Sequence, residues 1–206
     1  NLECLICEGS DVESIPKELV NLKYLDCSWT QIKFIPKELV NLEILDFSDT
    51  KIKIIPKELV NLRELICEGS DVESIPKELV NLKKLVCPLT HISEIPKELV
   101  NLKVLNCFCC IKIIGEIPKE LVNLRELICS TTRLKTIPKE LVNLEYLNCF
   151  ETEIKEIPKE LVNLKYLDCS WTQIKFIPKE LVNLKKISYK KISKFKKDRK
   201  GNILLN

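Results

Sequence analysis

One eight-residue phrase, IPKELVNL, recurs nine times along this chain of 206 residues. The copies begin at positions 15, 35, 55, 75, 95, 117, 137, 157 and 177, so the spacing is 20 residues with a single step of 22. A unit this short has no room for a full strand plus a long helix, and it cannot bury its own apolar face. The chain is therefore predicted to stack its units side by side in one elongated array.

The apolar positions of the second unit predict its local structure. Leu25 and Cys27 alternate with polar residues, which is the period of a strand with one buried face. Ile32 and Ile35 turn inward again further along the unit. Pro36 then opens a short turn, in which its missing N–H carries no penalty. Each unit is thus expected to be a short strand, a turn, and a brief 3-10 or extended return.

The repeat divides the chain into two parts. Residues 1–182 hold nine regular units, and residues 183–206 hold a divergent tenth unit with a basic C-terminal cap. The regular units begin at residues 1, 21, 41, 61, 81, 101, 123, 143 and 163. The chain contains no methionine and its first unit begins without a cap, so we expect further sequence before residue 1.

The stretch LKYLDCSWTQI at 22–32 resembles the leucine-rich repeat, whose pattern is L-x-x-L-x-L-x-x-N-x-L. The pattern runs through nine units, mostly with cysteine in place of the third leucine and Thr or Ser in place of the usual asparagine. The resemblance implies an α/β-type repeat solenoid. This would be a right-handed superhelix with a parallel β-sheet on its concave face and short 3-10 or extended segments on its convex face. The wording IPKELVNL is most similar to repeat proteins of giant DNA viruses that infect amoebae.

Eleven cysteines are the most unusual part of the composition. Eight of them share one unit position, which Phe47 and Tyr189 occupy in the third and tenth units. Because bulky aromatic residues substitute there, we interpret the column as buried packing and not as a metal or disulfide site. The alternative, a metal or redox thiol, is best placed at CFCC, residues 107–110. The column consists of Cys7, Cys27, Cys67, Cys87, Cys107, Cys129, Cys149 and Cys169.

The cysteine count also bears on location. An odd number of cysteines without a secretion signal favours free thiols in a reducing compartment. No apolar run reaches the roughly 18 residues of a membrane helix, so no membrane association is expected. We therefore expect an intracellular, cytoplasmic protein, and the viral resemblance implies the cytoplasm of an infected host cell.

A second column carries Thr or Ser and is predicted to be structural. A turn inside a stacked array cannot leave its backbone groups unpaired. The resemblance implies that these hydroxyls replace asparagine in a ladder of hydrogen bonds to neighbouring backbone. The column consists of Ser10, Thr30, Thr50, Ser70, Thr90, Thr132, Thr152 and Thr172.

The positions that vary between units should carry specificity, since the fixed ones build the solenoid. They are positions 3, 5, 7 and 8, counted from the leucine after each unit's asparagine, and they should line the concave face. Outward aromatic residues rimmed by charge favour a protein-binding surface there. Mutual support of side chains across the sheet is the alternative. The predicted partner-binding residues are Tyr24, Asp26, Trp29, Ile44, Asp46, Val86, Leu89, Val104, Phe108, Ile128, Tyr146, Phe150, Tyr166, Asp168 and Trp171.

Residues 21–40 and 163–182 are identical, so the stretch YLDCSWT at 24–30 returns at 166–172. In each copy the Tyr, Asp, Ser and Trp side chains are expected to point outward, Ser28 among them. Recent duplication explains the identity without any function. The alternative is a pair of matching patches, about 34 Å apart along the sheet, which a two-site partner would engage with avidity.

The sequence contains few of the residues that a catalytic site needs. A catalytic site needs a nucleophile, a base and an orienting group, but His91 is the only histidine and falls at a variable, turn-like position. The four glycines are isolated and form no phosphate-binding loop. We therefore predict a non-enzymatic protein without a cofactor or a bound metal.

The C-terminal segment is the second candidate site. Residues 183–206 carry nine Lys or Arg and one Asp, a net charge of +8, whereas the remainder of the chain carries −5. DRKGN at 198–202 predicts a turn, with Ile192, Phe195 and the run 203–205 as the apolar side of a strand–turn–strand cap. The alternative is contact with nucleic acid or an acidic surface through the basic run. That run contains Lys190, Lys191, Lys194, Lys196, Lys197, Arg199 and Lys200.

The leading prediction is a protein–protein interaction module whose partner is another protein, a host protein if the viral resemblance holds. A nucleic-acid or acidic-surface binder is the first alternative, and a structural repeat without a dedicated partner is the second. The salt dependence of binding separates a nucleic-acid binder from the leading prediction.

Overall fold

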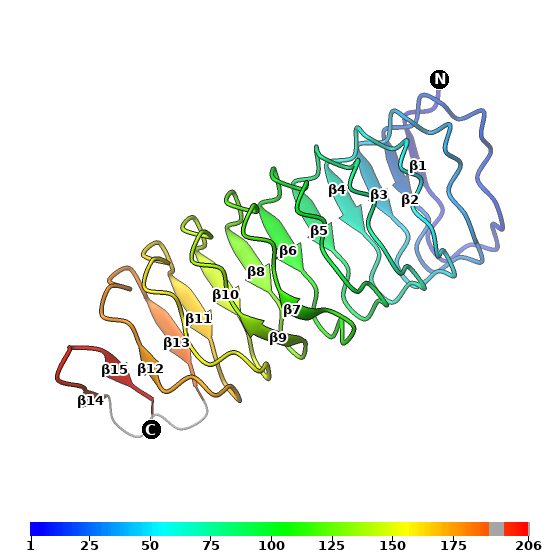
Figure 1. Cartoon of the computed structure of the whole chain (residues 1–206). Coiled ribbons are helices and arrows are strands. Elements are labelled where there is room, and N and C mark those ends of the chain that lie inside the picture. The colour runs from blue at the N-terminus through cyan, green and yellow to red at the C-terminus, as the bar shows by residue number, and fades with distance from the viewer. Residues whose placement is uncertain (190–195, 206) are drawn as a thin grey trace.

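The computed structural model describes residues 1–189 and 196–205, which form a curved solenoid (Figure 1). Ten short strands, one from each unit, build a single parallel sheet along its length. Neighbouring strands pair in the register of the repeat, so Leu25 lies opposite Leu45. In sheet order the strands are β1 (Cys4–Ile6), β2 (Tyr24–Asp26), β3 (Ile44–Asp46), β4 (Glu64–Ile66), β5 (Lys84–Val86), β6 (Val104–Asn106), β8 (Glu126–Ile128), β10 (Tyr146–Asn148), β11 (Tyr166–Asp168) and β13 (Lys186–Ser188).

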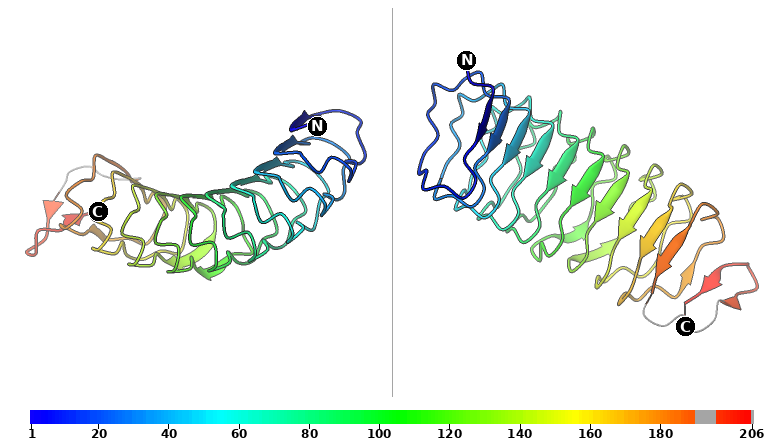
Figure 2. Two further views of the ribbon diagram at one scale, coloured as in Figure 1. Left: turned by 90° about the horizontal axis from the view of Figure 1, so that it is seen from above. Right: turned by 180° about the vertical axis from the view of Figure 1, so that it is seen from behind.

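The ten-stranded sheet lines the concave side of the curve, and the return segments of the units lie on the convex side (Figure 2). Two return segments pair as a short parallel sheet, β7 (Ile114–Glu116) with β9 (Arg133–Thr136). Over the described residues the return segments are extended and not helical. Each PKEL stretch closes a turn, as in the bond from the Leu39 N–H to the Pro36 carbonyl oxygen at 3.3 Å. The predicted solenoid with a parallel concave sheet is confirmed.

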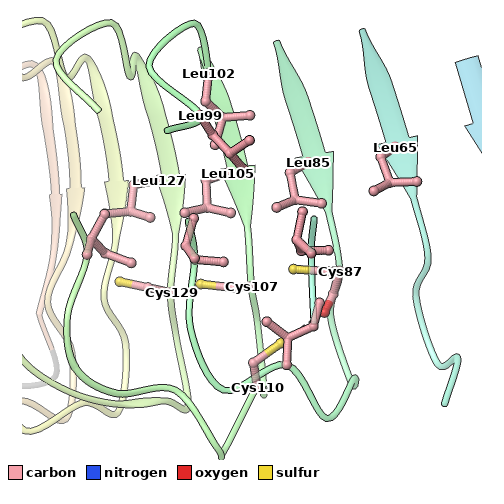
Figure 3. Close-up of a cluster of buried hydrophobic side chains, with 14 of the residues drawn as sticks. Leu65, Leu85, Cys87, Leu99, Leu102, Leu105, Cys107, Cys110, Leu127 and Cys129 are labelled. Atoms are coloured by element: carbon pink, nitrogen blue, oxygen red, sulfur yellow. The ribbon is translucent and has the colours of Figure 1, made fainter. Parts of the chain in front are cut away.

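The buried core consists of columns of like residues that stack from unit to unit (Figure 3). The middle residue of almost every concave strand points inward, so that Leu25, Leu45 and Leu65 are fully buried. The residues on either side of it, such as Tyr24 and Asp26, are half-buried. Burial of apolar surface contributes about 25 cal/mol per Å². Because one unit alone leaves its inner face open to water, this contribution depends on stacking.

The cysteine column belongs to this core. The sulfur atoms of Cys87, Cys107 and Cys129 lie in a row below the leucines (Figure 3), and all eleven cysteines are free. Phe47 fills the same position in the third unit and is fully buried. Burial raises the pKa of the Cys169 thiol to about 12, so thiolate is scarce there at neutral pH. These thiols pack in the core as small side chains, as the sequence predicts, and six of them also donate a weak hydrogen bond to a carbonyl oxygen of the next unit.

The sixth unit departs from the pattern at Cys110, which occupies the position of the Thr and Ser residues of other units. Its thiol donates to the Cys87 carbonyl oxygen at 2.9 Å, and Thr90 Oγ1 lies 3.4 Å from its sulfur. Hydrogen bonding to the Cys87 side chain and to Thr90 lowers the pKa of Cys110 to about 7, against the opposing effect of burial. The Cys110 side chain is fully buried, which keeps it from solvent-borne reagents.

Hydrogen bonds repeat in three columns: the Thr and Ser hydroxyls, the asparagines that open the units, and the cysteine thiols, as from Cys27 Sγ to the Asp46 carbonyl oxygen at 3.5 Å. Thr30 Oγ1 donates to the carbonyl oxygen of Cys27 at 2.7 Å, and every other member of its column repeats this bond. The predicted bonding to neighbouring backbone is confirmed, and each hydroxyl reaches the carbonyl oxygen of its own turn, three residues earlier. Side-chain bonds between successive units come from the cysteine thiols and from the asparagines that open the units. Asn41 donates to the Val20 carbonyl oxygen at 2.8 Å, and seven later asparagines do the same.

The C-terminal end of the solenoid carries a further small sheet. β15 (Ile203–Leu204) pairs antiparallel with both β14 (Lys196–Lys197) and β12 (Phe176–Ile177). The Leu205 side chain is buried, and its N–H donates to the Lys175 carbonyl oxygen at 2.9 Å. The end of the chain therefore folds back beside the return segment of the ninth unit.

Asp198 shapes the turn between β14 and β15. Its carboxylate accepts the N–H groups of Lys200 at 2.8 Å and Asn202 at 2.9 Å. These bonds lower the pKa of Asp198 although burial acts in the opposite direction. Ile192 and Phe195, which the sequence places in the same cap, lie outside the described residues. The part of the chain that the structure describes contains no helix with the length and hydrophobicity of a membrane span.

Candidate functional site

The fifteen residues predicted to bind a partner are all at least partly accessible to solvent. Eleven are half-buried and four are exposed. Those at unit positions 3 and 5 are the outer residues of the concave strands, and the parallel register aligns equivalent residues of successive units. Asp26 thus lies opposite Asp46, and Tyr24 lies opposite Ile44. The structure brings these residues together as two rows along the concave face.

The third-position row contains a stacked aromatic pair. The rings of Tyr146 on β10 and Tyr166 on β11 have centroids 4.3 Å apart and planes that differ by 4°. Lys186 Nζ lies 5.3 Å from the centroid of the Tyr166 ring, which is a cation–π contact. Burial raises the pKa of Tyr146 and the adjacent Tyr166 adds to this effect, so the Tyr146 phenol is neutral at physiological pH. Besides this aromatic surface, the row carries the ammonium groups of Lys84 and Lys186 and the carboxylates of Glu64 and Glu126.

The fifth-position carboxylates hold the turns that follow the strands. Asp26 Oδ1 accepts the Ser28 N–H at 3.1 Å and the Ser28 hydroxyl at 2.6 Å. Asp46 and Asp168 accept the equivalent N–H groups. The prediction that Ser28 points outward is wrong, because these bonds draw it inward and only 5% of it is exposed. Oδ1 of each carboxylate therefore holds the turn that follows its strand.

The eighth position of each regular unit has a left-handed backbone, which was not predicted. Trp29, Leu89 and Trp171 have φ angles of 58°, 58° and 60°. Gly9 and Gly69 occupy the same position, with φ angles of 65° and 63°. The two glycines could have predicted this turn from the sequence. A left-handed φ suits glycine and costs other residues about 1 kcal/mol or more. Three large apolar side chains thus stand in turns at the carboxyl ends of the concave strands, and not on the strands themselves.

Groups for catalysis are sparse among the described residues. His91, the single histidine, is exposed, and its backbone N–H donates to the Val72 carbonyl oxygen at 3.2 Å. Within residues 1–189 and 196–205, no three His, Cys, Asp or Glu side chains are placed to hold a metal ion. The concave face therefore offers apolar contact, aromatic stacking and hydrogen bonding.

Part of the basic C-terminal run can be placed. Lys197, Arg199 and Lys200 are exposed on and beside the hairpin of β14 and β15. Lys196 is the first residue of β14. The predicted residues Lys190, Lys191 and Lys194 lie outside the described residues.

A second apolar surface, on the convex side, was not predicted. Phe34 is 60% exposed and Ile54 is 78% exposed. Both line a hollow of about 450 Å³ together with Lys33, Lys51 and Lys53. The sequence could have predicted this surface, because Phe34 and Ile54 occupy a unit position that is polar in most other units.

Known proteins that resemble the chain in sequence or in structure contain leucine-rich repeats. A family model described as Leucine Rich Repeat matches residues 41–62. No curated protein sequence matches the chain. Among solved structures, the functional domain of InlJ from Listeria monocytogenes, described as including a cysteine ladder, matches with a TM-score of 0.69 at 18% identity. The findings support a leucine-rich-repeat protein.

Further solved structures share this leucine-rich-repeat fold. YopM, a leucine-rich effector protein from Yersinia pestis, matches with a TM-score of 0.75 at 21% identity, over 90% of this chain and 54% of that one. The HAESA receptor kinase ectodomain from Arabidopsis matches with a TM-score of 0.71 at 25% identity, over 89% of this chain and 38% of that one. The InlJ match covers 92% of this chain and 53% of that one. The chain thus spans about half the length of the InlJ domain and of YopM.

Proposed function

We propose that the chain is a non-enzymatic protein–protein interaction module that binds a protein partner on its concave face. One observation carries the proposal. Trp29, Leu89 and Trp171 are exposed by 64%, 51% and 57% in turns whose left-handed backbone disfavours large side chains. The other six regular units place glycine, cysteine or a polar residue at this turn, and exposed tryptophan is enriched among the residues that dominate binding energy.

The strand rows beside these turns supply the other contacts of a binding surface. Ile44, Val86 and Ile128 are half-buried apolar residues that a partner would cover. The stack of Tyr146 on Tyr166 provides a flat aromatic surface with hydroxyl groups. Mutual support across the sheet accounts for the tyrosine stack, whereas Trp29, which is 64% exposed beyond the end of its strand, keeps most of its surface open to a partner.

The leucine-rich-repeat fold generally mediates protein–protein interaction, and two solved relatives fit that use. The HAESA ectodomain was solved with an N-terminally extended IDA peptide hormone ligand. FLRT2 was solved in an octameric complex with Latrophilin 3 and Unc5D. Those ligands belong to those proteins, and they support only the class of partner proposed here.

The proposal is tested by affinity capture from source cells. The double variant Trp29→Glu, Trp171→Glu should lose at least about tenfold of the captured partner. Val142→Glu is the matched control, because Val142 is 41% exposed outside the concave rows. Circular dichroism should be unchanged in all variants. Full capture by the double variant contradicts the proposal, and loss of its circular dichroism signal favours sheet support.

Exposure of Lys197, Arg199 and Lys200 favours one alternative, the binding of nucleic acid or an acidic surface through the C-terminal segment. That binding should weaken steeply with salt and should disappear when these three residues are changed to glutamine. It should also ignore the Trp29 and Trp171 substitutions. If neither kind of binding is found, the chain is a structural repeat without a dedicated partner.

We further propose a cytoplasmic location, which the free thiols of the cysteine column support. The similarity of IPKELVNL to repeats of giant viruses makes a host protein the proposed class of partner. In this arrangement residues 1–182 would be the binding array, and residues 183–206 would close its end.

A further inference from the structure

The convex hollow that holds Phe34 and Ile54 is an apolar surface with no role in the concave site. The two side chains are 60% and 78% exposed. Lys33, Lys51 and Lys53 line the same hollow, which measures about 450 Å³. We call these five residues the Phe34–Ile54 patch.

The fold itself does not require apolar residues at this position. The return segment of the second unit is anchored by Ile32, which is fully buried, and Ile35, which is 4% exposed. Phe34, between them in sequence, points to solvent. Polar residues fill the equivalent position in six other units: Ser14, Ser74, Glu94, Glu116, Thr136 and Glu156.

The identical ninth unit shows what can cover such a residue. Phe176 is the counterpart of Phe34, and β15 places Leu204 opposite it in an antiparallel pair. The exposed fraction of Phe176 falls to 40%. In the described residues no equivalent segment pairs with Phe34. At the end of the array β15 takes the place that the third unit takes beside Phe34, and this extended apolar segment covers the phenylalanine more fully than the third unit does.

The rim of the patch sets the charge of its occupant. Within residues 1–189 and 196–205, Lys33, Lys51 and Lys53 form no ion pair with a carboxylate. Asp71 is the one carboxylate that lines the hollow. The C-terminal segment of a second copy is disfavoured, because residues 183–206 carry a charge of +8. A partner with carboxylates beside its apolar side chains complements the three lysines.

We propose that the Phe34–Ile54 patch docks an acidic amphipathic peptide segment of a partner protein. Two neighbouring apolar side chains of that segment fill the hollow, and its Asp or Glu residues pair with the lysines. An anionic membrane fits less well, because Glu13 and Glu73 stand in the flanking units at the position of Lys33 and would face the lipid. This surface is separate from the concave face, so its test is independent of the proposed function.

The chain supplies its own matched variant. The fourth unit has Glu-Ser at 73–74, where the second and third units have Lys-Phe at 33–34 and Lys-Ile at 53–54. Copying the fourth unit into both sites removes the patch with residues that already stand at this position in a folded unit. This graft consists of Lys33→Glu, Phe34→Ser, Lys53→Glu and Ile54→Ser.

The probe is the synthetic peptide Glu-Glu-Asn-Ile-Leu-Leu-Glu-Glu, labelled with fluorescein. Its centre copies residues 202–205, which run beside Phe176 in the ninth unit. We expect saturable binding by fluorescence anisotropy, together with a shift of the Ile54 δ1-methyl resonance in the wild-type chain. The graft, and a control peptide with Lys in place of Glu, should each bind at least about tenfold more weakly.

Three results would overturn the proposal. The first is no saturable binding up to about 1 mM peptide. The second is equal binding by the graft, with its circular dichroism spectrum unchanged. The third is binding of phosphatidylserine vesicles that the graft abolishes, without any binding of the peptide, which would assign the patch to a lipid surface.

Discussion

The units at 21–40 and 163–182 have identical sequences, and comparing them separates local structure from its surroundings. Trp29 and Trp171 have nearly the same left-handed φ, 58° and 60°. Thr30 and Thr172 each donate a hydrogen bond of 2.7 Å to the carbonyl oxygen three residues earlier. These features repeat because the turn is determined by the unit's own residues.

Burial differs between the two copies, because neighbours determine it. Phe34 is 60% exposed beside the third unit, whereas Phe176 is 40% exposed beside β15. Thr30 is buried, whereas Thr172 is half-buried next to the divergent tenth unit. The stability of a repeat protein is a sum of terms within units and terms between neighbours. This pair of units allows the two kinds of term to be measured within one chain.

Substitutions in the leucine column should change the free energy of unfolding most. Leu25→Ala and Leu167→Ala each remove a fully buried side chain, so each should lower the free energy of unfolding by about 3 kcal/mol. Both leucines lie between two stacked units, and the two losses should agree within about 1 kcal/mol. Urea unfolding followed by circular dichroism measures both. A large loss in only one copy would show that the two units do not belong to one cooperative core.

The second-largest loss of stability should come from Leu205→Ala and should be confined to the C-terminal copy, residues 163–182. Leu205 is 3% exposed, and Leu205→Ala should reduce the local stability of the ninth unit by about 2 kcal/mol. Hydrogen exchange should then speed up about 30-fold at residues 174–182 and stay unchanged at residues 32–40. Equal acceleration in the two copies would mean that β15 stabilises the whole array and not its end.

A smaller difference should appear at the turn carboxylates. Asp26→Ala leaves the buried Ser28 without an acceptor for its N–H and its hydroxyl, and should cost about 1–2 kcal/mol. Asp168→Ala should cost only about 0.5 kcal/mol, because Ser170 is half-buried and water can replace the carboxylate. Thermal unfolding of the two single variants makes the comparison. A reversed order would argue against this account of the turn.

The smallest change should be a gain in stability, from Trp29→Gly. Trp29→Gly relieves the left-handed backbone at φ 58°, and it should raise the free energy of unfolding by about 0.5 kcal/mol after the extra flexibility of the unfolded chain is subtracted. Trp29→Ala is the control, since alanine keeps the backbone penalty and should give no gain. Destabilisation by Trp29→Gly would show that the tryptophan supports the sheet.

Most of the scaffold could be predicted from the sequence, because repeat spacing and apolar period depend only on chain geometry. Leu25 and Cys27 were correctly placed in the core for that reason. The asparagine ladder was missed, because which side chain reaches the adjacent unit depends on how the turns stack in space. The exposure of Phe34 was missed too, since it is determined by what lies beside the return segment.

The candidate site also has features that the sequence predicts and features that it does not. The alternation of strand residues predicted that Tyr24 and Asp26 are accessible, and both are half-buried. The inward position of Ser28 was not predictable from alternation, because the chain leaves the strand at that point and bonds to Asp26.

The most direct test of concave-face binding is site-specific photo-crosslinking in source cells. Benzoylphenylalanine would replace Tyr24 or Tyr166 on the concave strands, and Val142 outside them. We predict that positions 24 and 166 crosslink to the same protein and that position 142 does not. Crosslinking of that protein from position 142 alone, with none from positions 24 and 166, would contradict the account.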